Sequence, residues 1–115
     1  MRARLAHRFF LAALLATGAL TMSPVSAQQS ATSLKRGEAL LTRNCARCHA
    51  TGTTGRSPHP AAPPFRTLAR KYPIDGLQEA LGEGLSVGHP DMPEFVFEPD
   101  DIASILAYLK SIQER

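Results

Sequence analysis

The stretch NCARCHA, residues 44–50, contains both cysteines of the 115-residue chain and one of its four histidines. Cys45 and Cys48 are three positions apart, and His49 follows the second cysteine directly. Four uses fit two thiols and an imidazole at this spacing: a disulfide, a redox-active dithiol, part of a zinc site, or a covalent attachment site for haem. The rest of the sequence distinguishes between them.

The amino terminus has the pattern of a secretory signal. Three arginines precede the apolar run FFLAALLATGAL (residues 9–20), and the small residues of VSA (25–27) follow it. A basic head, a short apolar segment and a small-residue end are typical of a signal peptide. A membrane-spanning helix needs about 20 apolar residues, which is more than this run supplies. We therefore expect a signal peptide at 1–27 that is cleaved after Ala27, a periplasmic location, and no stable membrane anchor in residues 28–115.

The signal segment also carries the whole net charge of the chain. The chain has 13 lysines and arginines against 10 acidic residues, and three of the arginines lie in the first 27 residues. Residues 28–115 therefore have ten basic and ten acidic side chains and a net charge of zero. A basic patch is the usual electrostatic mark of a nucleic-acid-binding protein, so this balance predicts no nucleic-acid partner.

Three of the four uses of the cysteine pair fit the sequence poorly. A disulfide across so short a loop constrains the unfolded chain little, although export would oxidise thiols that are not otherwise engaged. A zinc site needs four ligands, and no second closely spaced pair accompanies Cys45 and Cys48. A redox dithiol of the thioredoxin type needs a βαβ framework, and only FVF at 95–97 alternates like a strand.

The spacing Cys-x-x-Cys-His is that of a covalent haem attachment site. Thiols at positions i and i+3 lie on one side of a helical turn, where each can form a thioether with one haem vinyl group. A histidine directly after the second cysteine then lies beneath the iron and can serve as its axial ligand. We therefore predict one haem c, bound covalently through Cys45 and Cys48, with His49 as an iron ligand.

Periodicity and breaker residues predict an all-α domain at 28–115, with about four helices wrapped around the haem and long Pro- and Gly-rich loops. The expected elements are a disordered leader at 28–32, a helix capped by Ser33 that runs to Cys45, a loop at 50–64, short helices within 64–72 and 74–85, an irregular segment at 86–99 and a helix from Pro99. Gly37 lies inside the first helix, where glycine costs about 1 kcal/mol relative to alanine. It predicts the close approach of another backbone or ring, unless the glycine is merely tolerated.

The opposite face of the iron needs a second ligand or stays open. Met92 is the single methionine outside the signal segment, and Pro90 and Pro93 would fix its loop. A thioether favours reduced iron, so His/Met ligation raises the reduction potential relative to His/His ligation. We predict Met92 as this ligand. The alternatives are that Met92 only fills a gap in the core, and that His89 or His59 ligates the iron instead.

On these features the sequence resembles the small class I cytochromes c of bacteria. The resemblance covers the chain after the signal segment: an amino-terminal helix, CARCH, a proline-rich loop, a methionine loop with MP, and a carboxy-terminal helix. It implies that the first and last helices cross near a glycine and an aromatic residue. Gly37 and Tyr108 match these positions, with Ile105 near Tyr108. Leu41 replaces the usual aromatic residue of the first helix.

The resemblance also implies contacts around the haem. In the family a proline carbonyl accepts a hydrogen bond from the axial histidine, and in the stretch APPF Pro63 matches this proline better than Pro64. We expect Phe65 and Phe95 to pack against the haem. The chain has no tryptophan, a residue that often bonds a haem propionate in relatives. The candidates to replace it are Arg66 and Arg70.

These features predict a soluble, monomeric, periplasmic electron carrier that is not itself an enzyme. An iron with both axial positions filled has no place for a substrate and changes by one electron with little rearrangement. Its partners would be a redox donor and a redox acceptor that dock briefly on a small surface at the haem edge. The alternatives are a haem-c subunit of a larger dehydrogenase or oxidase, and a ligand sensor or enzyme in which Met92 leaves the iron.

Overall fold

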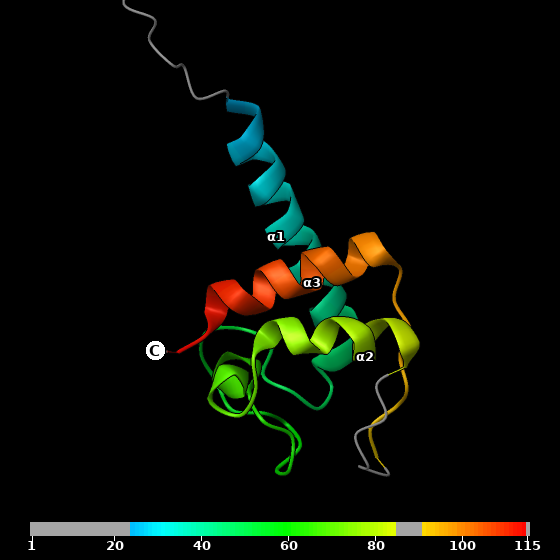
Figure 1. The fold of residues 1–115 in the computed structure, drawn as a ribbon. Coiled ribbons are helices and arrows are strands. Elements are labelled where there is room, and N and C mark those ends of the chain that lie inside the picture. The colour runs from blue at the N-terminus through cyan, green and yellow to red at the C-terminus, as the bar shows by residue number, and fades with distance from the viewer. Residues whose placement is uncertain (1–23, 85–90, 115) are drawn as a thin grey trace, which may run out of the picture.

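The computed structural model describes residues 24–84 and 91–114 (Figure 1). Its main elements are three α-helices: α1 (Pro24–Cys45), α2 (Leu77–Glu83) and α3 (Pro99–Ile112). Two short 3-10 helices, η1 (Phe65–Arg70) and η2 (Ile74–Gly76), lie between α1 and α2 in the chain. The described ranges contain no strand, so FVF at 95–97 does not form one. The predicted all-α fold class is confirmed.

Helices α1 and α3 cross in direct contact, as Figure 1 shows. Gly37 lies at the crossing, where a Cβ atom would collide with the backbone oxygen of Ser104 and come within 2.8 Å of Tyr108 Cβ. The absence of a side chain therefore allows the two helices to approach this closely. The close approach predicted from Gly37 is confirmed. Leu41 on α1 and Ile105 on α3 are buried, in keeping with their positions in the resemblance.

The hydrophobic core lies around α3, which contacts α1, α2 and both 3-10 helices. Pro99 suits the first turn of α3 because no backbone N–H is needed there, and two aspartates follow it near the positive end of the helix dipole. Apolar residues recur along α3 at spacings of three and four, so that one face is buried. The core residues are Leu40, Leu41, Phe65, Leu68, Ile74, Leu81, Ile102, Ile105, Leu106, Tyr108, Leu109 and Ile112.

Helix α1 begins earlier than the sequence pattern indicated. It starts at Pro24 rather than at Ser33, and the leader expected to be disordered at 28–32 is helical. The side chains of this stretch are exposed and compatible with a helix, and two of its hydroxyls donate hydrogen bonds to carbonyl oxygens four residues earlier. Ser33 therefore does not cap the helix, and its hydroxyl lies 3.4 Å from that of Ser104 on α3.

The first turns of α1 project away from the rest of the described structure (Figure 1). Residues 26–32 are exposed throughout. The first 23 residues, which hold most of the predicted signal peptide, lie outside the described residues, so cleavage after Ala27 stays a prediction. No helix within the two described ranges has the length and apolar character needed to cross a membrane.

Candidate haem site

The Cys-x-x-Cys-His motif forms the turn that follows α1. The backbone oxygen of Cys45 accepts hydrogen bonds from the N–H groups of Cys48, at 3.1 Å, and His49, at 2.9 Å. Both cysteines are free thiols and are partly buried. All three side chains line one cavity, so the turn presents two thiols and an imidazole to the same space.

The ring of His49 is fixed by two neighbours. Its Nδ1 atom lies 2.8 Å from the backbone oxygen of Pro63, the proline that the resemblance favoured over Pro64. A carbonyl can only accept, so Nδ1 carries the ring hydrogen and Nε2 keeps a free lone pair. The ring of Phe65 stacks on the imidazole, with centroids 4.6 Å apart and planes at 30°. This arrangement leaves Nε2 available to bind a metal ion.

The proline-rich loop at 50–64 folds back against the motif. The N–H of Ala50 donates to the hydroxyl of Ser57 at 3.0 Å, and the N–H of His59 donates to the backbone oxygen of Cys48 at 3.1 Å. Gly55 turns the chain with a φ of 87°, a conformation that favours glycine. These contacts explain how so long a connection without secondary structure has a defined path, and they bring Pro63 to His49.

A cavity of about 400 Å³ lies between this loop, the motif and the segment that carries Met92. Its volume is within the usual range for small-molecule and cofactor pockets, about 300–1,000 Å³. Cys45, Cys48, His49, Pro63, Met92 and Phe95, all singled out from the sequence, come together in its walls. The remaining wall residues are Arg43, Asn44, Arg47, His59, Ala61, Ala62, Asp91 and Pro93.

Phe65 is not among the residues that line the cavity, and its expected contact with the haem stays a prediction. It opens η1, its N–H donates to the backbone oxygen of Ala50 at 2.9 Å, and only 8% of it is exposed. The Phe65 ring packs in the core and stacks on the imidazole of His49. The contact of Phe65 with the site is therefore indirect, through the imidazole of His49.

His89, one of the two histidines that were alternatives to Met92 as an iron ligand, lies outside the described residues.

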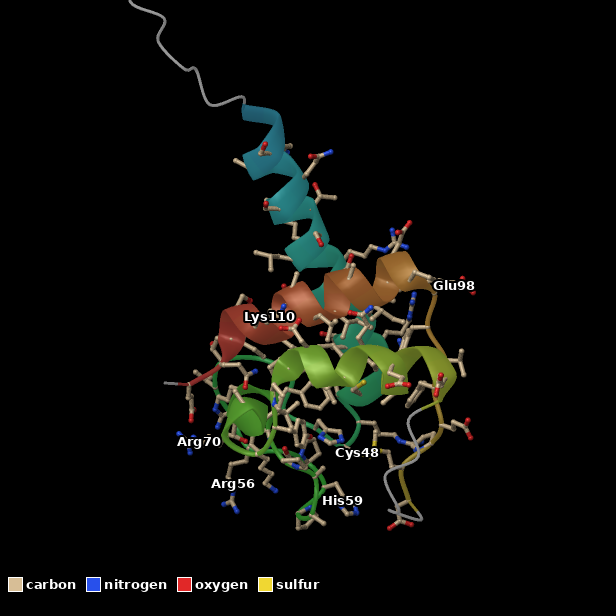
Figure 2. All side chains as sticks on the ribbon, in the orientation of Figure 1. Cys48, Arg56, His59, Arg70, Glu98 and Lys110 are labelled. Atoms are coloured by element: carbon tan, nitrogen blue, oxygen red, sulfur yellow. The ribbon has the colours of Figure 1, made fainter. Side chains whose placement is uncertain are left out.

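Arg66 and Arg70, the candidates for contact with a haem propionate, do not line the cavity. Both pair with the carboxylate of Glu114, at N–O distances of 2.7 and 2.8 Å, and Arg70 points outward in Figure 2. One nitrogen of Arg66, Nη1, is buried without a partner in the described part of the chain. The positive side chains on the cavity wall are instead Arg43 and Arg47.

Among the ionisable wall residues, Arg43, Arg47 and Asp91 had no site role in the sequence-based prediction, and His59 had one only as an alternative ligand. A signal for the two arginines was present, because each lies two positions from Cys45. Asp91 could have been placed near the site because it directly precedes Met92. The position of His59 depends on the path of the loop at 50–64, and no local pattern encodes that path.

The state of the thiols argues against the rival uses of the motif. Burial, reinforced by the neighbouring Cys48, raises the pKa of the Cys45 thiol to about 11. A redox dithiol needs a thiol whose pKa is lowered, because the thiolate is the reactive form. Within the described ranges, no group of three or more His, Cys, Asp and Glu side chains is arranged to hold a metal ion. The raised pKa of the Cys45 thiol therefore argues against a redox dithiol.

An all-α domain with crossed terminal helices, and with a Cys-x-x-Cys-His turn facing a methionine, has the fold of the class I cytochromes c. A family model described as "Cytochrome C oxidase, cbb3-type, subunit III" matches residues 32–109, and the chain belongs to this family. Its cytochrome c domain implies covalently bound haem c and haem-based electron transfer. No curated protein and no solved structure matches the chain.

Proposed function

We propose that the chain is a monohaem c-type cytochrome that carries single electrons between redox proteins in the periplasm. The observation that supports this most directly is the shared cavity. His49 and Met92 are far apart in the sequence, yet both line the space that the two free thiols also line. This is the set of groups that a covalently attached, six-coordinate haem iron requires.

The residues of the cavity fit such a haem. Cys45 and Cys48 would hold the porphyrin by thioethers, His49 would ligate the iron through Nε2, and Met92 would ligate it from the opposite side. Alanine, proline and phenylalanine side chains supply apolar wall, and Arg43 and Arg47 supply positive charge. Bound there, haem c supplies an iron that gains and loses one electron.

The protein's own contribution on the axial side is the orientation of His49. The bond from Nδ1 to the Pro63 oxygen fixes the tautomer and makes the free nitrogen more basic, and the Phe65 ring limits rotation of the imidazole. With Met92 as its second ligand, the iron would have no position open to a substrate. We therefore assign electron transfer rather than catalysis, and the sensor or enzyme alternative requires Met92 to leave the iron.

A pyridine haemochrome spectrum of the exported protein tests the assignment. We expect the absorption typical of haem with two thioethers, at one haem per chain. Cys48→Ser should leave at most one thioether and shift this spectrum. Ala46→Ser is the matched control, because it changes another residue of the motif, one that does not line the cavity, without removing a thiol. A wild-type haemochrome from the Cys48→Ser variant would contradict the roles assigned to the two cysteines.

The family match favours a second candidate, in which the same domain is a haem-c subunit of an oxidase complex. The two candidates share the haem chemistry and differ in assembly. Gel filtration and affinity purification from detergent-solubilised cells distinguish them. A free carrier, without membrane anchor after signal cleavage, elutes as a monomer, whereas a subunit co-purifies with fixed amounts of other oxidase subunits.

A further inference from the structure

The segment that carries Met92 has one polar contact with the opposite side of the cavity. Asp91 Oδ2 lies 3.9 Å from Nε2 of His59, on the proline-rich loop. Within the described ranges, residues 91–96 make no hydrogen bond to the rest of the protein, and this contact of a carboxylate with an imidazole is their only polar contact with it. The next fixed point is at Phe97, whose N–H donates to the backbone oxygen of Leu81 at 2.9 Å.

The other side of this contact is tied to the haem attachment motif. The N–H of His59 donates to the backbone oxygen of Cys48 at 3.1 Å, and the N–H of Ala61 donates to His59 Nδ1 at 3.2 Å. Since Nδ1 accepts a hydrogen bond, the ring hydrogen of the neutral imidazole is on Nε2, the atom nearest Asp91. His59 lies low in the view of Figure 2, below Cys48.

These contacts form a continuous path across the cavity: Cys48, His59, Asp91 and, next in the chain, Met92. His59 and Asp91 both line the cavity, so the path runs along its wall and not over a remote surface. The side chain of His59 is 41% exposed and that of Asp91 is 83% exposed. Water screens a contact this exposed, so its effect should be modest.

We propose that His59 is a positioning residue that holds the segment at 91–93 against the cavity and so keeps Met92 on the iron. The inference rests on the proposed function, because it requires Met92 as the sixth ligand. Loss of the contact with Asp91 increases the fraction of time for which the sixth position is open. Small external ligands then gain access to ferric iron, while the attachment through the cysteines is unchanged.

Two substitutions separate the two contacts of the His59 ring. His59→Asn can keep an acceptor for the Ala61 N–H but does not reach Asp91. His59→Gln can place an amide donor near the position of Nε2 and restore that contact. Arg56→Ala is the matched control, because it changes an exposed side chain of the same loop that does not line the cavity.

The measurement is the affinity of the haem-loaded ferric protein for imidazole, titrated by absorbance. We expect His59→Asn to raise this affinity about two- to fivefold, the scale of a weak exposed polar contact. His59→Gln and Arg56→Ala should remain close to wild type. Asp91→Asn, which removes the negative charge that faces Nε2, should raise the affinity as His59→Asn does.

Two results would overturn the inference. One is an imidazole affinity of His59→Asn equal to that of the wild type. The other is an equal rise for His59→Asn and His59→Gln, which would assign the effect to the loop and not to the contact with Asp91. In both cases an unaltered haemochrome spectrum leaves the proposed function standing. A chain that carries no thioether-bound haem would overturn the proposed function and, with it, this inference.

Discussion

The two predicted iron ligands are fixed to very different degrees. His49 is held by the Pro63 carbonyl and by the stacked ring of Phe65, whereas Met92 lies on a segment with one exposed polar contact. Substitutions near Met92 should therefore alter ligation without affecting haem attachment. Substitutions behind His49 should disturb packing as well, since Phe65 belongs to the core.

Met92→Ala should remove the sixth ligand and lower the reduction potential, because the thioether stabilises reduced iron. The ferric protein should bind external ligands without competition from the side chain. Potentiometry and the ferric spectrum measure both effects. Met92→His is the matched variant, since it fills the position but also lowers the potential. A potential unchanged in both variants would remove Met92 from the site.

Tyr108 should make stability depend on pH in the alkaline range. Burial, and then the nearby charge of Glu38, raises the pKa of the hydroxyl above its ordinary value of 10.0. A folded-state pKa above the unfolded value means that the neutral hydroxyl favours folding. This contribution is complete below about pH 10 and is lost as the pH rises through the folded-state pKa.

Tyr108→Phe tests this dependence by chemical denaturation between pH 7 and pH 11. At neutral pH the free energy of unfolding of the variant should be lower by about 0.5–1.5 kcal/mol, because the Tyr108 hydroxyl donates a hydrogen bond to the backbone oxygen of Thr51 at 3.2 Å. Above pH 10 the difference from wild type should shrink. Tyr72, whose pKa burial also raises, is the control: it is 41% exposed, and Tyr72→Phe should cost less at neutral pH. If the free energies of unfolding of Tyr108→Phe and wild type differ by the same amount at every pH, titration of the Tyr108 hydroxyl does not affect stability.

At the level of elements, sequence patterns predicted the helices but not all of their boundaries or contacts. The apolar spacing of α3 and its start at Pro99 were clear, because both depend on neighbouring residues. The extension of α1 to Pro24 was missed because exposed polar residues give no periodic signal. The pairing of Arg66 and Arg70 with Glu114 joins positions far apart in the chain, so no local pattern encodes it.

Gly37→Ala tests the crossing of α1 and α3. Alanine favours a helix by about 1 kcal/mol relative to glycine. The added methyl group would meet the backbone of Ser104 and the Cβ of Tyr108, neither of which can turn aside. Overpacking of this kind costs about 1–3 kcal/mol or more, so we expect net destabilisation. Denaturant titration measures the change in the free energy of unfolding. The control is Thr42→Ala, a substitution at an exposed position of the same helix. A variant more stable than wild type would show that the helices separate easily.

On the scale of the whole molecule, the described structure divides into a packed side and an open side. The packed side is the core around α3, reinforced by ion pairs of Arg36 with Asp101 and of Lys110 with Asp75, at 2.6 and 2.5 Å. The open side consists of loops around the cavity. The sequence predicted the two thiols, the imidazole of His49 and the thioether of Met92 in the cavity wall from their chemistry alone, since such groups are scarce in this chain. It could not predict how the loops bring Arg43, His59 and Asp91 to the same wall.

The exposed first turns of α1 should not contribute to this packed side. Intact mass should show that the exported protein begins at Gln28, and a chain that starts at Ser33 should unfold at nearly the same temperature. A chain that starts at Gly37 should be less stable, because it loses the partly buried Leu34 and the Arg36–Asp101 pair. Equal melting temperatures for the chains starting at Ser33 and Gly37 would contradict the assigned contacts.

The end of α1 at the cavity has an electrostatic consequence. The peptide dipoles of α1 add up to a partial negative charge at its carboxyl end, and that end is at Cys45, beside the proposed iron. Negative potential there favours ferric iron, whereas the Met92 thioether favours ferrous iron. Arg43, in the last turn of the helix, offsets part of the negative potential. The midpoint potential of this protein should therefore reflect opposing influences, and charge reversal at Arg43 should lower it without any change of ligand.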